Sequence, residues 1–135
     1  MEKETLKNIF KFLEKNDNIK APFIWKLENN IPFSKEDLKV KGNLLLQYTK
    51  ITSLPEGLKV EGNLDLDGCY IFKFLPKGLE IGGYLSLTHS DIKSLPEGLK
   101  VGGNLIITDT PLAKLSDDEL IEMIKPGFIE GEIFK

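Results

Sequence analysis

Asp65, Asp67, Asp109 and the single histidine, His89, are the side chains of this sequence that could do chemistry together. Asp65 and Asp67 lie two residues apart, so on a β-strand both point to the same side, about 7 Å from each other. If the chain coils with a period of about 20 residues, His89 lies beside this pair on the next turn and Asp109 one turn further. Carboxylates next to a histidine can hold a metal ion or act as a general acid and base.

A plain surface role suits the same side chains better. The sequence has no second histidine to complete a metal site, and charged side chains on a strand surface discourage aggregation. Its one cysteine, Cys69, falls on the inward side of the predicted coil, as expected of a core thiol rather than a nucleophile. A Gly-rich phosphate loop, a serine elbow and a Cys-x-x-Cys pair are all absent. We therefore predict no catalytic residue, no metal and no cofactor, and rank a hydrolytic enzyme that uses Asp65, Asp67 and His89 below a binding protein.

A repeat of 20–21 residues gives these side chains their positions. The motif Leu-Pro-x-Gly-Leu begins at Leu54, Leu75 and Leu95, and proline and glycine together favour a corner in the chain. Each repeat also contains a short apolar alternation typical of a strand, then a small residue, then an apolar residue. The strand alternations begin at Leu44, Leu64, Leu85 and Leu105; the small residues are Thr49, Cys69, Ser90 and Thr110; the apolar residues are Ile51, Ile71, Ile92 and Leu112. One turn buries too few apolar side chains to fold alone, so the turns must stack. We predict a β-rich solenoid of about four turns, leucine-rich-repeat-like or parallel β-helix-like.

The segments on either side of the repeats are predicted to close the ends of the stack. Residues 2–15 have apolar side chains at helical spacing. Ser116 and Glu119 form a capping box for a helix that ends at Pro126. Residues 19–33 show no regular pattern, and we expect them to cover the first turn. The sequence thus predicts one domain over 1–135, with an N-terminal helix and cap in 1–31, repeats in 32–115, and a C-terminal helix and tail in 116–135.

Composition excludes several classes of function. The chain has 135 residues, enough for one domain, and a net charge of −3. All its basic residues are lysine, which argues against nucleic-acid binding, since arginine is the preferred phosphate reader. Its longest apolar runs are too short to cross a membrane. The single cysteine and the charged N-terminus fit a cytoplasmic protein.

Outward positions on the strands differ from turn to turn, whereas the inward ones are alike, and this is how solenoids carry binding specificity. The second turn also has one extra residue within 69–74, beside several aromatic side chains; either one of these projects as an anchor for a partner, or Phe72 or Phe74 fills the core. The outward columns are Leu45, Asp65, Ser86 and Ile106; then Gln47, Asp67, Thr88 and Thr108; and beside them Tyr48, Gly68, His89 and Asp109. The residues predicted to bind a partner are Leu45, Gln47, Tyr48, Asp65, Asp67, Tyr70, Phe72, Ser86, Thr88, His89, Ile106 and Thr108.

The run from Leu44 to Leu58 resembles a leucine-rich repeat of the short bacterial type, which carries Leu-Pro near its end, and the resemblance covers residues 32–115. Similar Gly-Asn-Leu and Leu-Pro-x-Gly-Leu repeats occur in small proteins of phages and prophages, which this chain resembles. One departure concerns the asparagine that in such repeats bonds the next turn, because Thr49, Cys69, Ser90 and Thr110 stand in its place. A flatter parallel β-helix therefore competes with a horseshoe.

The resemblance implies a non-catalytic protein-binding solenoid, and more narrowly a phage-encoded inhibitor of a host defence protein such as a CRISPR nuclease. The alternative is a bacterial leucine-rich-repeat effector or scaffold domain that binds another protein. In both cases we expect a protein partner in the cytoplasm, with no direct contact to nucleic acid or membrane. The sequence leaves the oligomeric state open; a homodimer would form end to end or through Phe23 and Trp25.

Overall fold

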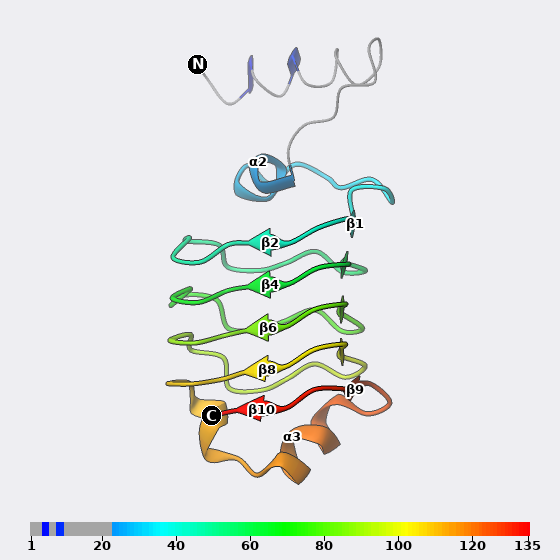
Figure 1. The fold of residues 1–135 in the computed structure, drawn as a ribbon. Helices are drawn as coiled ribbons and strands as arrows, with labels where there is room; N and C mark the ends of the chain where they lie inside the picture. The colour runs from blue at the N-terminus through cyan, green and yellow to red at the C-terminus, as the bar shows by residue number, and fades with distance from the viewer. Residues whose placement is uncertain (1–3, 6–7, 10–22) are drawn as a thin grey trace. The chain divides into compact units, whose positions relative to one another are not determined.

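The computed structural model describes residues 4–5, 8–9 and 23–135, and the chain divides into two compact units, residues 1–34 and 35–135 (Figure 1). In the first unit, α2 (Phe23–Glu28) occupies a segment for which the sequence showed no regular pattern. The Phe23 and Phe33 rings pack with centroids 4.9 Å apart, and Asn29 Nδ2 donates a hydrogen bond to the Trp25 carbonyl at 2.8 Å. The helix predicted over 2–15 falls mostly outside the described residues; residues 4–5 and 8–9 within it are helical.

The second unit is a parallel β-solenoid, as predicted, and its strands form two five-stranded parallel sheets. Figure 1 shows the strands of one sheet lying one beneath another along the stack. Sheet A contains β1 (Lys39–Val40), β3 (Lys59–Val60), β5 (Glu80–Ile81), β7 (Lys100–Val101) and β9 (Phe128–Ile129). Sheet B contains β2 (Leu44–Leu45), β4 (Leu64–Asp65), β6 (Leu85–Ser86), β8 (Leu105–Ile106) and β10 (Ile133–Phe134).

The register of sheet A confirms the repeat. Lys39 pairs with Lys59, Lys59 with Glu80, and Glu80 with Lys100, which reproduces the predicted steps of 20, 21 and 20 residues. Leu-x-Leu and Leu-x-Val side chains therefore fall in the same place on every rung. Leu46, Leu58, Leu66, Leu79, Leu87 and Leu99 have no exposed surface, so the core runs along the axis of the stack.

Each turn has two corners in which the backbone is left-handed. One is the predicted Leu-Pro-x-Gly corner, where Gly57, Gly78 and Gly98 have φ of +83°, +71° and +79°. The other follows the sheet B strands and is made by Tyr48 (φ 59°), Gly68 (φ 70°), His89 (φ 58°) and Asp109 (φ 55°). This column was predicted to lie beside the strands; the structure makes it a bend, where side chains stand at the rim of the sheet.

The inserted residue of the second turn corrects one inward assignment. Ile51, Ile92 and Leu112 are buried, as predicted, but Ile71 is 49% exposed and Phe72 takes its place with no exposed surface. Phe72 lies three residues after Cys69, whereas Ile51 lies two after Thr49, so the extra residue lies between Cys69 and Phe72. Cys69 is itself fully buried, as predicted.

Asparagine does join the rungs, but at a position other than the one expected from the leucine-rich repeat. Asn43 Oδ1 accepts from the Asn63 amide at 2.8 Å, and Asn63 Oδ1 accepts from the Tyr84 amide at 2.8 Å. Asn104 Oδ1 accepts from the Glu132 amide at 2.9 Å. Thr49 instead bonds the carbonyl three residues before it, at 2.7 Å. The ladder therefore belongs to the Gly-Asn-Leu motif between the two sheets.

The fourth turn is longer than the others because it contains helical segments. Lys100 pairs with Phe128, 28 residues later, and the chain between them forms η1 (Pro111–Lys114) and α3 (Asp117–Ile124). Ser116 caps α3 by accepting a hydrogen bond from the Glu119 amide, as predicted. The segment predicted as a tail is instead a further rung, β9 and β10. No helix among the described residues is both long and apolar enough to cross a membrane.

Candidate protein-binding surface

The outward side chains of sheet B form one surface, which we call the B face. The register pairs Leu45 with Asp65, Asp65 with Ser86, and Ser86 with Ile106, which confirms the predicted outward column. Phe134, which was not among the predicted residues, extends this column to the last rung because it pairs with Ile106. The B face comprises Leu45, Gln47, Asp65, Asp67, Ser86, Thr88, Ile106, Thr108 and Phe134.

Hydrogen bonds fix the polar side chains at the middle of the B face. Asp67 Oδ1 accepts from the Ser86 hydroxyl and from the Thr88 amide, the latter at 3.0 Å. Asp65 Oδ1 accepts from the Asp67 amide at 2.9 Å. The two carboxylates are therefore held in place before any partner arrives.

Burial raises the pKa of the Asp65 carboxyl above its ordinary value, because partial removal of water disfavours the charged form. The hydrogen bond from the Asp67 amide acts in the opposite direction, and the negative charge of Asp67 raises the pKa further. An opposite charge placed beside Asp65 would stabilise its ionised form.

Apolar side chains flank this polar centre along the stack. Leu45 is 48% exposed on the first rung and Phe134 45% exposed on the last, and Ile106 is half-buried. Tyr48, at the corner beside Leu45, is 71% exposed. Its ring lies against Gly68 on the next rung, where a Cβ atom would collide with it. Exposed apolar side chains mark a contact surface where they lie side by side, as Leu45 and Tyr48 do on the first rung.

Two of the predicted surface residues prove to be buried. Ser86 is only 3% exposed, because it lies beneath the carboxylate of Asp67 to which its hydroxyl donates. Phe72 has no exposed surface and belongs to the core. Its neighbours Tyr70 and Phe74 are 66% and 72% exposed, so the aromatic surface of the second turn comes from them.

His89 does not lie with the aspartates of the strand but at the corner. Its Nδ1 is 3.4 Å from Asp109 Oδ2, one rung further, and both side chains are largely solvated. No group of three or more histidine, cysteine or acidic side chains among the described residues could hold a metal ion. The constellation considered from the sequence therefore divides into an Asp65–Asp67 pair and a His89–Asp109 pair.

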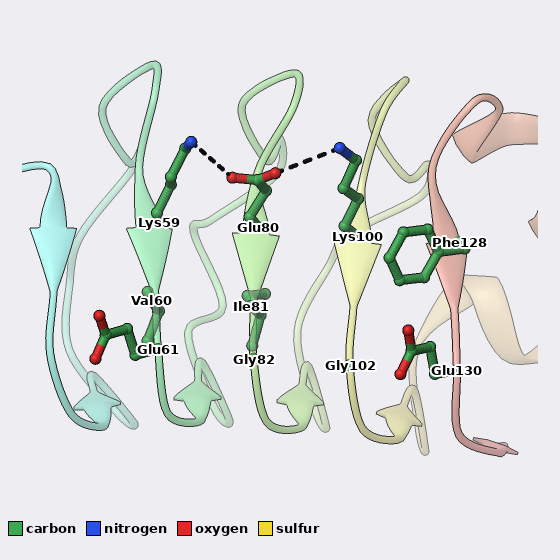
Figure 2. Close-up of a pocket in the computed structure, with 10 residues that line it drawn as sticks. All are labelled: Lys59, Val60, Glu61, Glu80, Ile81, Gly82, Lys100, Gly102, Phe128 and Glu130. Carbon is green, nitrogen blue, oxygen red and sulfur yellow. Dashed lines mark hydrogen bonds and ion pairs between the residues drawn. The ribbon is translucent and has the colours of Figure 1, made fainter.

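Sheet A carries a different surface, which was not predicted from the sequence. Glu80 bridges two rungs, with Oε2 3.0 Å from Lys59 Nζ and Oε1 3.4 Å from Lys100 Nζ. The hydrogen bond from Lys59 lowers the pKa of the Glu80 carboxyl, and Lys100 adds to this effect. Figure 2 shows a shallow depression below these side chains, with Glu61 and Glu130 on either side of Gly82 and Gly102. Cβ atoms at these two glycines would collide with the carbonyls of the preceding rung, so packing alone explains them.

The chain was compared with models of protein families, with curated proteins and with solved structures, and none of the three comparisons finds a match.

Proposed function

We propose that this chain is a non-catalytic protein-binding module that recognises another protein through the B face and the corner beside it. The observation that carries this proposal is the arrangement of the B face. Hydrogen bonds from the backbone fix the carboxylates of Asp65 and Asp67, and exposed apolar side chains lie on either side of this pair. A solenoid backbone holds these groups rigidly, so they need little ordering on binding, which favours affinity.

The B face alone is too small for a stable interface, which supports the proposal that the corner beside it also contacts the partner. Four rung spacings of about 4.8 Å and an extended segment of about five residues on each rung, the strand and the residues after it, give roughly 300 Å². A stable interface buries about 800 Å² on each partner. Contacts must therefore extend beyond the strands, and the exposed rings of Tyr48 and Tyr70 supply the large apolar area that such contacts need.

A narrower form of the proposal is a phage-encoded inhibitor of a host defence protein, such as a CRISPR nuclease, acting in the host cytoplasm. Its support is the likeness of the Gly-Asn-Leu and Leu-Pro-x-Gly-Leu repeats to those of small phage proteins. The bacterial leucine-rich-repeat effector or scaffold shares the binding role and ranks second. An enzyme using Asp65, Asp67 and His89 ranks third, because His89 pairs with Asp109 instead.

The binding role is tested by placing charge in the B face. The double variant Leu45→Lys/Ile106→Lys should lose the partners that the parent chain retains from a host lysate, with little change in melting temperature. The control variant Ser53→Lys/Ser94→Lys adds the same two charges at exposed positions in the loops that connect sheet B to sheet A, and it should retain the partners. If the B-face variant retains every partner, the B face is not the interface.

The narrower form needs a different readout. Expression of the chain in a strain whose CRISPR nuclease destroys a target plasmid should restore transformation by that plasmid. The same strain carrying Leu45→Lys/Ile106→Lys should destroy the plasmid as before. Unchanged plasmid loss with the parent chain would remove that nuclease as the target and leave the binding role to be decided by the lysate experiment.

A further inference from the structure

We propose that the segment recognised by the B face is basic: it places a lysine or arginine side chain against Asp65 and Asp67, and apolar side chains on both sides of that contact. This inference rests on the proposed function and adds the chemistry of the partner.

The charges of the two sheets point to a basic partner. Asp65 and Asp67 are the only charged residues among the nine positions of the B face, although the chain has 18 basic residues. The corresponding outward positions of sheet A hold four lysines against three glutamates, namely Lys39, Lys41, Lys59 and Lys100 against Glu61, Glu80 and Glu130. The B face is therefore the side of the solenoid that would attract a cationic segment and repel an acidic one.

The two carboxylates are prepared for a cation. Each uses its Oδ1 to accept from a backbone amide or a hydroxyl, and the two carboxyls also interact with each other, while among the described residues no backbone or hydroxyl donor bonds to the second oxygen of either. These second oxygens can accept from a guanidinium, which donates through a planar fork, or from an ammonium. Burial and the nearby charge of Asp67 disfavour ionisation of Asp65, and the attraction of a cation at this place acts against both effects because it favours the ionised carboxylate.

The apolar side chains set the length of the segment. Leu45 lies one rung from Asp65, and Ile106 lies two rungs away on the other side. At about 4.8 Å per rung, they are separated by roughly 14 Å along the stack. An extended chain covers this distance in about five residues, with alternate side chains facing the solenoid. The partner segment that fits the B face therefore has an apolar residue at its first and fifth positions, a basic residue at its third, and any residue at its second and fourth.

A pair of peptides tests the charge directly. The full chain, labelled with ¹⁵N, is titrated with acetyl-Leu-Thr-Arg-Thr-Leu-amide and with the same peptide carrying citrulline, a neutral isostere of arginine. We expect the arginine peptide to shift the amide resonances of Asp65, Asp67 and Thr88 saturably, and the citrulline peptide to bind at least tenfold more weakly. Equal binding of both peptides, shifts confined to Glu61 and Glu130 of sheet A, or no shift at millimolar concentration would each overturn the inference.

Variants separate this inference from the function on which it rests. Asp65→Asn/Asp67→Asn removes both charges and keeps oxygens that can accept the same hydrogen bonds, so the fold should persist while the arginine peptide loses its preference over citrulline. Glu80→Gln removes one charge from sheet A and should leave that preference unchanged. A natural partner that is lost by Leu45→Lys/Ile106→Lys but bound equally well by Asp65→Asn/Asp67→Asn would keep the binding role and refute the basic segment.

Discussion

The rungs are joined by an asparagine of one turn and a glycine of the next. Asn63 Oδ1 passes through the space that a Cβ atom on Gly83 would occupy, and Asn43 Oδ1 does the same at Gly62. The asparagine can bond the backbone of the next rung only because the residue that faces it there is a glycine, which has no side chain to block the contact. Gly42 has no preceding asparagine, and a Cβ atom there would meet nothing within 4 Å.

This pairing predicts coupling between two substitutions. Gly83→Ala should cost about 1–3 kcal/mol of unfolding free energy in the parent chain, because the added methyl group displaces the Asn63 side chain. In an Asn63→Ala background the cost should fall by about 0.5 kcal/mol or more, since the obstructing oxygen is gone. Urea unfolding of the four chains measures the coupling. Gly42→Ala is the control and should be nearly neutral; strictly additive effects of Gly83→Ala and Asn63→Ala would contradict the pairing.

Asp65 gives a prediction with a defined sign. Its pKa is raised in the folded chain, mainly by burial, so the stability that its protonated form supplies is present at low pH and lost as pH rises through the folded pKa. Asp65→Asn should therefore unfold at a higher urea concentration than the parent at pH 7, and this difference should vanish below pH 3.8, the ordinary value. A parent more stable than Asp65→Asn at pH 7 would show that ionised Asp65 stabilises the fold.

Glu80 should behave in the opposite way. Its pKa is lowered, mainly by the hydrogen bond from Lys59, so the stability that it supplies is present above pH 4.5, the ordinary value, and lost as pH falls through the folded pKa. Glu80→Gln should thus be less stable than the parent at pH 7, by a small amount because the bridge is partly exposed, and equal to it in strong acid. Urea unfolding midpoints measured from strong acid to pH 7 test the predicted direction of the stability change for both Asp65→Asn and Glu80→Gln. If Glu80→Gln is still less stable than the parent in strong acid, the substitution removes packing and not charge.

At the scale of the turns, the second repeat shows how one extra residue is accommodated. Ile71 turns outward and Phe72 fills the core position. Phe72→Ala should cost about 3–5 kcal/mol of unfolding free energy, because it leaves a large cavity inside a close-packed stack. Ile71→Ala should cost less than 1 kcal/mol, since half of that side chain is already in water. Urea denaturation distinguishes the two, and comparable losses would mean that both side chains share the core.

The period of the leucines fixed the strand register in advance, because a shift of one residue would turn every apolar side chain outward. For the second turn the sequence left open whether Phe72 or Phe74 fills the core, and the structure confirms Phe72; Ile71 was assigned inward as well, because all three are apolar and only packing chooses between them. The corner after the sheet B strands was also missed, because only one rung has a glycine there, Gly68, to signal a left-handed backbone.

The last rung was missed for a different reason. Ile129-Glu130-Gly131-Glu132-Ile133 matches Val60-Glu61-Gly62-Asn63-Leu64 in pattern, but η1 and α3 lengthen the fourth turn to 28 residues and hide the period. In the candidate site, the outward columns followed from the register. The burial of Ser86 did not, because it depends on how the Asp67 side chain turns, which no spacing in the sequence specifies.

At the scale of the solenoid, each rung is stabilised chiefly by its two neighbours, so an edge must be closed. At the C-terminal end, β9 and β10 pair with the last full turn, and Figure 1 shows α3 beyond them at the end of the stack. The Leu105 amide donates to the Glu132 carbonyl at 2.9 Å, and the Ile107 amide to the Phe134 carbonyl at 2.8 Å. Lys135 Nζ lies 2.8 Å from Asp117 Oδ1 and links the end of the chain to α3.

Removal of residues 127–135 should therefore reduce the protection of backbone amides most on the rung next to the deletion and less on rungs further away. Without β9 and β10, the Leu105 and Ile107 amides lose their acceptors and should exchange with deuterium far faster, and the open edges of β7 and β8 should promote self-association. The Leu64 amide donates to the carbonyl of Tyr84, and Tyr84 lies two rungs from the deleted rung. This amide should therefore keep most of its protection. Lys135→Ala is the control, since loss of one partly exposed ion pair should change exchange little. Equal loss of protection at Leu64 and Leu105 would mean that the rungs unfold as one cooperative unit, and then contacts beyond the nearest neighbour must hold the solenoid together.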